Sequence, residues 1–514
     1  MAVAARDIQS WERRFPVGES TGSTQVLDPS LAETTHSPEH RRAWGLLLLA
    51  ASMCAGAAVR AWLSFHDDGI YWPDEIYQSL EPAHRLVFGY GLIPWEFVQG
   101  ARSWALPGLV AGLLKSSVWV GAAEPRQYLY LVRLFFSAVG AASAFASYRL
   151  ARSYGASTLA AACGAALFAL SAPMIYFGPR AMSETSSALP VVYGLALSLA
   201  PTPKRWARVL GASLLGAAVM LRLQTAIFCV ALVAMLAARR QWRLVLEAVA
   251  VLGVWAVLFG LLDKLTWGGW FHSAIAYLRA NVLEHKAEVW GTAPATYYLE
   301  VIWRSMPAPA VCMMVLGLLA VARAPGLLLA AVAFVVVHSL VPHKELRFIF
   351  PALPIFCALA GIGIGVLQTR FRGVAGLAIA AVLISSGASA VFFHRLSFGD
   401  LGQYENLKPG ASAYDDFGTV NRLLLAAHER PDLCGLKIEA VHLAWTGGFT
   451  YLHRPVPLYP HVGPPRASGF YNYVIAYAAL APAEEIVAAE GNLVLQRLPR
   501  SACVKDNAYH WLLP

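Results

Sequence analysis

Two short clusters of polar residues have the types and spacing expected of a reactive site. In the first, Pro73 precedes Asp74 and Glu75, and proline followed by acids is typical of the first turn of a helix. Such a helix places its side chains in two neighbouring groups: Asp74, Gln78 and either Glu81 or Pro82 on one face, and Tyr77, Glu81 and His84 on the next. A carboxylate held there could take a proton from a polar acceptor as a general base.

The same stretch continues with further polar and aromatic side chains that would suit a substrate site, among them Trp95, Glu96 and Arg102. An isolated Pro-Asp-Glu is more often a helix cap in a solvated loop, and aromatic residues alone can form an interfacial belt. The density of acids, histidine and arginine among the aromatic residues favours a site over these alternatives.

The second cluster is Pro342-His343-Lys344-Glu345-Leu346-Arg347-Phe348, between two apolar segments. Three potential cations beside a membrane could hold the phosphate of a lipid, or they could be anchors whose charged ends reach the interface. Two further cations, Arg180 and Arg222, lie at turns between apolar segments. Pairing with Glu184 or with a bound phosphate would offset the cost of placing their charges near a bilayer.

The elements that must position these clusters are membrane helices. Of 514 residues, 57% are hydrophobic and 14% are charged, and mean hydropathy is +0.52. Soluble domains have about 25% charged residues, so this composition excludes an ordinary soluble protein. The net charge of +9 comes from short basic clusters between apolar runs. That pattern indicates cytoplasmic loops of a polytopic membrane protein and gives no reason to expect a nucleic-acid partner.

The positive-inside bias orients the chain with its N-terminus inside and its C-terminus outside. It also predicts that 106–121 lies in or near the interface, because a span there would turn the later basic clusters outward. We expect about eleven spans, at 43–65, 128–150, 157–177, 181–200, 208–221, 224–238, 244–262, 307–322, 325–341, 348–368 and 373–393.

This orientation divides the chain into three parts. Residues 1–42 would be a disordered cytoplasmic tail, 43–393 a transmembrane catalytic domain, and 394–514 a small outward α/β domain. The outward loops 66–127 and 263–306 belong to the transmembrane part. The aromatic and amide residues of the second loop would suit either a sugar ring or a loop that re-enters the interface. Cys434 and Cys503 could form a disulfide if the C-terminal part is exported.

Several motifs together resemble glycosyltransferase family 22, the GT-C mannosyltransferases of GPI-anchor and N-glycan-precursor assembly. The resemblance covers roughly 45–395 and rests on these stretches: Pro73-Asp74-Glu75 with Gln78-Ser79-Leu80-Glu81 and His84, Phe88-Gly89-Tyr90-Gly91, Trp95-Glu96, Arg102-Ser103, and His343-Lys344-Glu345-Leu346-Arg347-Phe348 with Pro351. Departures from the family pattern are Trp72, often His, Pro94, often Thr, and Arg222-Leu223-Gln224-Thr225-Ala226 in place of Arg-Pro-Thr-Ala.

The resemblance implies a GT-C fold and an inverting transfer of a hexose, which in this family is mannose, from a polyprenyl-phosphate sugar to a glycan or glycolipid acceptor on the outer face. Asp74 matches the family's catalytic aspartate and Glu75 its neighbour. His343, Lys344, Arg347 and Arg222 would stabilise the leaving phosphate. Substrate contacts are expected from Gln78, Glu81, His84, Trp95, Glu96, Arg102 and Arg180.

This scheme requires no metal and no other cofactor; its partners are the lipid donor, the acceptor and membrane lipids. The competing hypothesis is a transporter or flippase of lipid-linked sugars, which would carry polar residues at mid-membrane depth. Polar residues collected at one face favour chemistry. The sequence lacks an Asn-x-Ser/Thr sequon, which favours a bacterial inner membrane over the endoplasmic reticulum.

Overall fold

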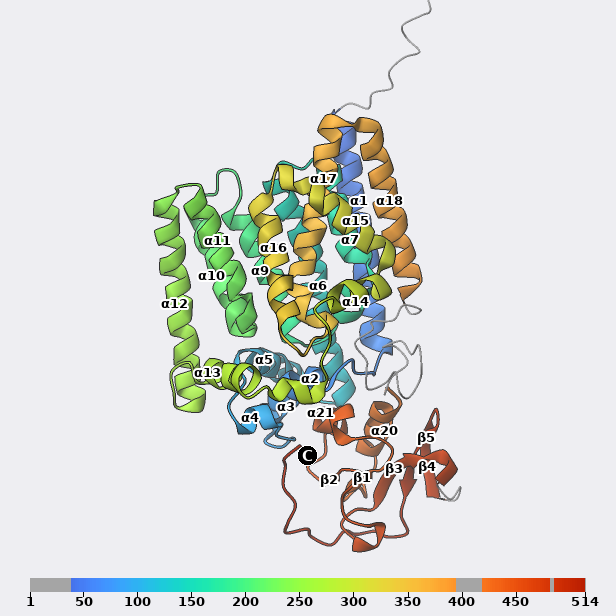
Figure 1. The fold of residues 1–514 in the computed structure, drawn as a ribbon. Coiled ribbons are helices and arrows are strands. Elements are labelled where there is room, and N and C mark those ends of the chain that lie inside the picture. The colour runs from blue at the N-terminus through green and yellow to red at the C-terminus, as the bar shows by residue number, and fades with distance from the viewer. Residues whose placement is uncertain (1–37, 394–417, 481–484, 514) are drawn as a thin grey trace, which may run out of the picture.

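The computed structural model describes residues 38–393, 418–480 and 485–513. Most of the expected N-terminal tail and the start of the expected C-terminal domain lie outside these ranges. Long apolar helices form one bundle, and a small mixed domain sits at one end of it (Figure 1).

The bundle helices follow the predicted apolar runs. They are α1 (Pro38–His66), α6 (Pro125–Ser153), α7 (Thr158–Leu170), α9 (Ser183–Ser198), α10 (Arg205–Leu221), α11 (Ala226–Ala238), α12 (Trp242–Trp267), α15 (Pro307–Leu319), α16 (Pro325–Leu340), α17 (Leu353–Arg370) and α18 (Arg372–Val391). Prolines start α6, α15 and α16, where their fixed backbone angle suits the first helical turn. Among the described residues, five helices are long and apolar enough to cross a membrane, and others are shorter, so the eleven-span count stays a prediction.

A buried arginine fixes a break between two of these helices. Arg60, fully buried within α1, donates hydrogen bonds to the carbonyl oxygens of Ala169 and Met174 at 2.8 and 2.9 Å. These carbonyls flank the break between α7 and α8 (Ala172–Phe177), where the helical ladder leaves them without backbone partners. The break sets the course of the following turn, which carries Arg180.

Short elements gather at the end of the bundle that faces the small domain (Figure 1). From the first loop come α2 (Pro73–Glu75), the π-helical turn η2 (Ile76–Leu80), α3 (Glu81–Phe88), α4 (Trp95–Val98) and α5 (Ala105–Trp119). From the second come α13 (His272–Leu278), the π-helical turn η4 (Arg279–Leu283), η5 (Lys286–Trp290) and α14 (Tyr297–Ser305). The 3₁₀ turn η7 (Leu346–Ala352) leads from the second polar cluster into α17.

The C-terminal domain is α/β, as its sequence pattern predicts. Its sheet has the order β2-β1-β3-β5-β4 and comprises β1 (Leu436–Ile438), β2 (Leu458–Tyr459), β3 (Tyr473–Tyr477), β4 (Ile486–Glu490) and β5 (Leu493–Arg497). β1 runs parallel to β2 and β3, whereas β5 runs antiparallel to β3 and β4. Helices α20 (Gly418–His428) and α21 (Gly448–Leu452) lie between the sheet and the bundle (Figure 1).

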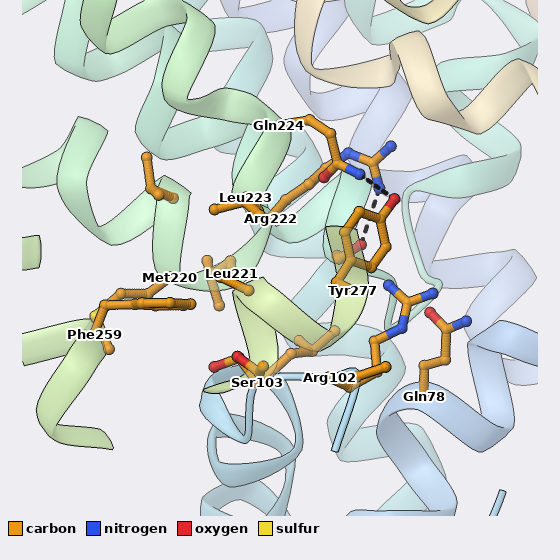
Figure 2. Close-up of a pocket in the computed structure, with 16 residues that line it drawn as sticks. Gln78, Arg102, Ser103, Met220, Leu221, Arg222, Leu223, Gln224, Phe259 and Tyr277 are labelled. Atoms are coloured by element: carbon orange, nitrogen blue, oxygen red, sulfur yellow. Dashed lines mark hydrogen bonds between the residues drawn. The ribbon is translucent and has the colours of Figure 1, made fainter. Parts of the chain in front are cut away.

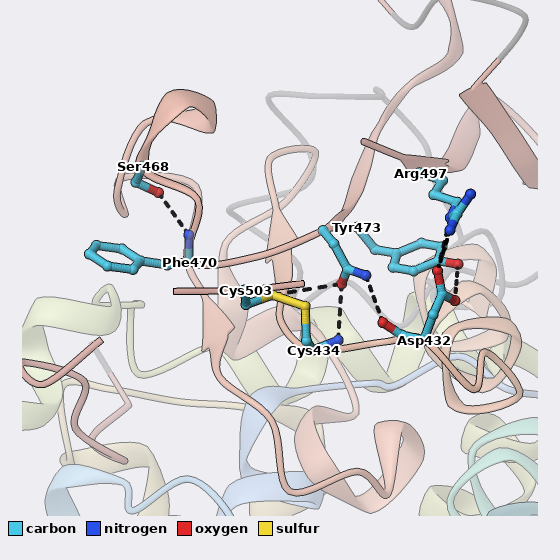
Figure 3. Close-up of a disulfide and its surroundings, with 8 residues drawn as sticks. Asp432, Cys434, Ser468, Phe470, Tyr473, Arg497 and Cys503 are labelled. Atoms are coloured by element: carbon cyan, nitrogen blue, oxygen red, sulfur yellow. Dashed lines mark hydrogen bonds and ion pairs between the residues drawn. A yellow bond between two sulfur atoms is a disulfide. The ribbon is translucent and has the colours of Figure 1, made fainter. Parts of the chain in front are cut away.

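A disulfide closes the C-terminal domain on itself. Cys434 and Cys503 are bonded, with 5.7 Å between their Cα atoms (Figure 3). The side chain of Asn472 links the bridge to the sheet, because it accepts a hydrogen bond from the Cys434 amide and donates one to the Asp432 carbonyl. The pairing predicted for an exported domain is therefore present.

Candidate active site

Asp74 begins the first loop's helix in the predicted way. Pro73 starts α2, and the helix then widens into the π-helical turn η2 before it continues as α3. Ser79 stabilises this change, since its hydroxyl donates 2.6 Å hydrogen bonds to the carbonyl oxygens of Glu75 and Ala181. π-Helical turns are rare in proteins as a whole, and those that do occur are frequently found at functional sites.

Arg347 gathers three carboxylates around one guanidinium. It contacts Asp74 at 2.5 Å, Glu345 at 2.6 Å and Glu184 at 3.3 Å. The side chains of Arg347, Glu184 and Glu345 are each 2% exposed, whereas that of Asp74 is 24% exposed. Of the three acids, Asp74 is therefore the one that a substrate can reach.

The network extends from Arg347 to a second arginine and to a histidine. Arg222 donates to Glu184 at 2.6 Å, and His343 contacts Glu345 at 3.0 Å. Burial would raise the pKa of Glu345, but the charge of Arg347 and the hydrogen bond from His343 outweigh it, so the pKa is lowered. Burial would likewise lower the pKa of His343, but Glu345 outweighs it and the pKa is raised. The pair thus favours a charged state on both partners.

A narrow cavity of about 60 Å³ lies beside this network (Figure 2). Its polar lining includes Gln78, Arg102, Arg222, Gln224 and Tyr277, and its apolar lining comes mainly from 219–223 and from α12. The cavity joins cations to an apolar wall, a combination suited to the phosphate end of a lipid.

Arg102 is the least compensated cation in the cavity lining. Its guanidinium carbon lies 5.5 Å from the centre of the Tyr277 ring, and its Nε is buried without a hydrogen-bond partner among the described residues. Tyr277 is held by Gln224, whose amide donates to its hydroxyl at 2.6 Å. The described residues give Arg102 no ion pair, so its charge, which also acts on the nearby carboxyl of Glu96, is available to an anionic ligand.

Gln78 connects this cavity to a buried acid. Its side-chain amide donates to Glu96 at 3.0 Å, and both residues lie close to the Asp74 turn. Burial raises the pKa of Glu96 to about 7; Arg102 opposes this effect and the charge of Asp74 adds to it. The carboxyl of Glu96 therefore changes its charge close to neutral pH.

Comparison with known proteins identifies the group to which this arrangement belongs. The model of the Alg9-like mannosyltransferase family matches residues 52–405. The chain belongs to this family. GPI mannosyltransferase 3 of Yarrowia lipolytica is 32% identical over 66% of the chain and 67% of its own length. GPI alpha-1,2-mannosyltransferase 3 of Danio rerio is 26% identical over 59% of the chain and 57% of its own length.

The matches span somewhat more than half of the length of these curated relatives, from 57% to 67%. Among solved structures, ArnT from Cupriavidus metallidurans bound to undecaprenyl phosphate has a TM-score of 0.57 and 17% sequence identity, covering 90% of the chain and 99% of its own. This likeness shows the GT-C fold. With the apolar helices, it establishes a multi-pass integral membrane protein of the Alg9-like family.

In this Alg9-like chain, Glu75 faces a different partner from Asp74. Its carboxylate accepts a 2.7 Å ion pair from Arg180, which also pairs with Asp67 at 2.8 Å. The sequence predicted that Arg180 would pair with Glu184 or with a phosphate, but Glu184 pairs with the other two arginines, 222 and 347. Arg180 therefore braces the base of the Asp74 turn.

Lys344 and Trp95 lie beside the second long loop, 263–306. The ammonium of Lys344 donates to the carbonyl oxygens of Ala293 and Pro342 at 2.7 and 3.3 Å, and burial lowers its pKa. Lys286 lies 5.9 Å from the centre of the Trp95 ring. Both contacts hold that loop against the site. Neither Lys344 nor Trp95 lines the cavity beside Arg222.

The other predicted helix face carries Tyr77, Glu81 and His84, and it contacts the C-terminal domain. Tyr77 donates to the Leu443 carbonyl at 2.8 Å. Glu81 is fully buried and accepts hydrogen bonds from the two amides and the hydroxyl at 449–450, between 2.8 and 3.1 Å. His84 contacts His453 at 2.9 Å. The predicted grouping is thus present, but Glu81 and His84 lie in a domain interface, away from the cavity.

Sequence reasoning gave no role to Glu345 or Gln224, and it left Tyr277 among the aromatic residues of 263–306 that would suit either a sugar ring or a loop that re-enters the interface. Glu345 stood inside a cluster read as cationic, and its pairing with Arg347 could have been suspected because the two are two residues apart. Gln224 and Tyr277 come from separate loops. No local signal joins those two residues.

Proposed function

We propose that this protein transfers mannose, with inversion, from a polyprenyl-phosphate donor to a glycan or glycolipid acceptor on the outer face of the membrane. The observation that carries the proposal is the continuous ion-pair chain from Asp74 through Arg347 and Glu184 to Arg222, and Arg222 is the member of this chain that lines the cavity. It connects the one substrate-accessible acid of the network to a cationic cavity with an apolar wall.

In the proposed reaction, Asp74 accepts the proton of an acceptor hydroxyl through the carboxylate oxygen that Arg347 does not hold. The hydroxyl oxygen then bonds to the anomeric carbon, and the bond from that carbon to the phosphate oxygen breaks. The electron pair leaves with the phosphate, whose charge Arg222 and Arg102 would stabilise. One base is enough for inversion, because the phosphate leaves without prior protonation.

Two independent findings support the lipid donor. The ArnT structure of similar fold holds undecaprenyl phosphate. In the cavity wall, Arg222 is flanked by the apolar residues Val219, Met220, Leu221 and Leu223. The names of the relatives are those of mannosyltransferases, which favours this proposal over the transporter alternative. The C-terminal disulfide supports an outward, oxidising side for the site.

The experiment that tests the proposal compares Asp74→Asn with Glu429→Gln, an exposed acid far from the cavity lining. Purified proteins in lipid vesicles receive labelled polyprenyl-phosphate mannose and a glycolipid acceptor, and the product is identified by mass. We expect Asp74→Asn to reduce turnover by about 10²–10⁴-fold while donor binding and melting temperature are kept. Turnover by Asp74→Asn equal to that of the control variant would exclude Asp74 as the base.

A further inference from the structure

A second cavity lies on the other side of α13 from the first. Its volume is about 450 Å³, within the range of small-molecule sites, and it is lined by Gln99, Trp270, His272, Arg279, Glu284 and Lys286 together with small and apolar residues of α13. None of these residues lines the first cavity. Ser273 and Tyr277 face the first cavity while Ile275 and Arg279 face the second, so α13 and η4 form a shared wall.

The shared wall is built as an interfacial helix. Asp263, fully buried at the end of α12, fixes its start by accepting the Ser273 amide at 2.7 Å and its hydroxyl at 2.8 Å. The outer side of the wall exposes large apolar side chains, namely Trp270, Phe271, Ile275, Leu278, Val282 and Leu283. In a membrane protein, such a surface belongs at the boundary between headgroups and acyl chains. The second cavity therefore opens where lipid headgroups lie.

The charges of the second cavity suit an anionic headgroup. Glu284 pairs with Arg279 at 2.7 Å and with Lys286 at 2.9 Å, so two cations share one carboxylate and a positive charge is left over. The side chain of Arg279 is 73% exposed and that of Lys286 is 38% exposed, so both can reach a ligand. The amide of Gln99 and the half-exposed ring of Trp270 are the polar and stacking groups that a sugar uses.

The second cavity is also connected to the Asp74 turn. Lys286 donates to Gln99 at 2.9 Å and lies over the ring of Trp95, at the two ends of α4. Glu96, the residue after Trp95, accepts the hydrogen bond of Gln78. The short helix α4 thus lies between the second cavity and the turn that carries the proposed base.

We propose that the second cavity binds the phosphate-bearing headgroup of the acceptor, so that the acceptor is a membrane glycolipid that enters beside α13. The inference rests on the proposed function. It assigns the two amphiphilic substrates to opposite sides of one interfacial helix: the donor phosphate beside Arg222 and Arg102, and the acceptor phosphate beside Arg279 and Lys286.

A crosslinking experiment tests the site without requiring turnover. Full-length Asp74→Asn protein carrying benzoylphenylalanine at position 275 is placed in phosphatidylcholine vesicles with tritiated mannosyl-phosphatidylinositol and irradiated. We expect labelled protein, with the label competed by unlabelled glycolipid and not by phosphatidylglycerol or by the water-soluble glycan. Equal competition by phosphatidylglycerol would mean that the cavity binds bulk anionic lipid. Competition by the free glycan would mean that binding does not require the lipid part of the acceptor. Either result overturns the proposal.

A kinetic experiment separates the two substrates. The double variant Arg279→Ala, Lys286→Ala should raise the acceptor KM at least about tenfold and leave the donor KM unchanged, because charge-assisted contacts to one substrate are lost. Lys115→Ala, an exposed cation on α5 outside both cavities, is the matched control and should change neither KM. A rise in donor KM alone would assign the cavity to the donor and overturn the proposal. If the glycolipid crosslinks as expected but the wild-type protein transfers no mannose, the result counts against the proposed function and not against the binding site.

Discussion

Replacing Glu81 tests whether this acid holds the C-terminal domain against the bundle or binds a substrate. The carboxylate accepts four hydrogen bonds, from the amides of Leu92, Phe449 and Thr450 and from the Thr450 hydroxyl, all between 2.8 and 3.1 Å. Three of these donors belong to the C-terminal domain. A buried donor left without an acceptor costs about 1–3 kcal/mol. Glu81→Ala should therefore weaken docking of the domain by roughly 3 kcal/mol or more, the sum over three donors at the low end of that range.

The assay measures melting temperature and protease release of the C-terminal domain in detergent, together with the KM values of both substrates. We expect Glu81→Ala to melt lower and to release the domain faster, whereas the exposed control Glu429→Gln should behave as wild type. Glu81→Gln should fall between them, because its amide group would face the donors of Thr450. An unchanged melting temperature with a raised acceptor KM would refute the docking role and restore Glu81 to the substrate site.

Three further predictions concern charge. Burial raises the pKa of Glu96 to about 7, so the folded protein holds this proton more tightly than the unfolded chain, and its stability falls as pH rises from 4.5 to about 7. Glu96→Gln should therefore raise the melting temperature at pH 8 and change it little at pH 4.5. Equal shifts of the melting temperature at both pH values would contradict this prediction. Burial and the neighbouring histidines lower the pKa of His84 to about 3 and that of His453 to about 4, so docking of the C-terminal domain should weaken as pH falls below 6.5. Protease should release the domain faster at pH 5.5 than at pH 7.5, and His84→Gln should reduce this difference. Release at a rate independent of pH would contradict the prediction. Arg222→Lys should raise the donor KM and leave the acceptor KM unchanged, as measured by initial rates; the reverse pattern would place the donor phosphate elsewhere.

The histidines of that docking contact face several other groups. His428 packs against His453 with 5.7 Å between ring centres and contacts Glu124 at 2.8 Å, and the Tyr90 hydroxyl lies 3.4 Å from His453. Protonation of either buried ring would bring positive charges together, because Glu124 is mostly exposed and already serves His428. This is the physical reason for a contact that loosens in acid.

Much of the scaffold could be predicted because its signals are local. Apolar runs predicted the bundle helices, and the Pro73-Asp74-Glu75 sequence predicted both the start of the first loop's helix and its two faces. The pattern of the tail predicted a small α/β domain, and the sheet and helices of that domain are present. Each of these depends on residues within a few positions of one another.

The assignment of roles inside the site was harder, because it depends on partners far away in the chain. Arg347 reads as a phosphate ligand until Glu184, 163 residues earlier, and Asp74, 273 residues earlier, are seen to meet it. Arginine has the same chemistry toward a carboxylate and toward a phosphate, so residue type alone could not separate the two. The same holds for Glu81, whose carboxylate oxygens can accept hydrogen bonds from a sugar as well as from a peptide backbone.

The distance along the chain between Glu81 and its partners has a consequence for biosynthesis. The amides of Phe449 and Thr450 that satisfy this acid lie 368 and 369 residues downstream, so they are synthesised after every apolar helix of the bundle. Until then, the segment that carries Asp74 has a carboxylate with most of its acceptor capacity unused. A ribosome that stops early would therefore leave an inserted bundle whose reactive loop lacks its last brace, and catalytic competence would be acquired only when the final stretch of the polypeptide arrives.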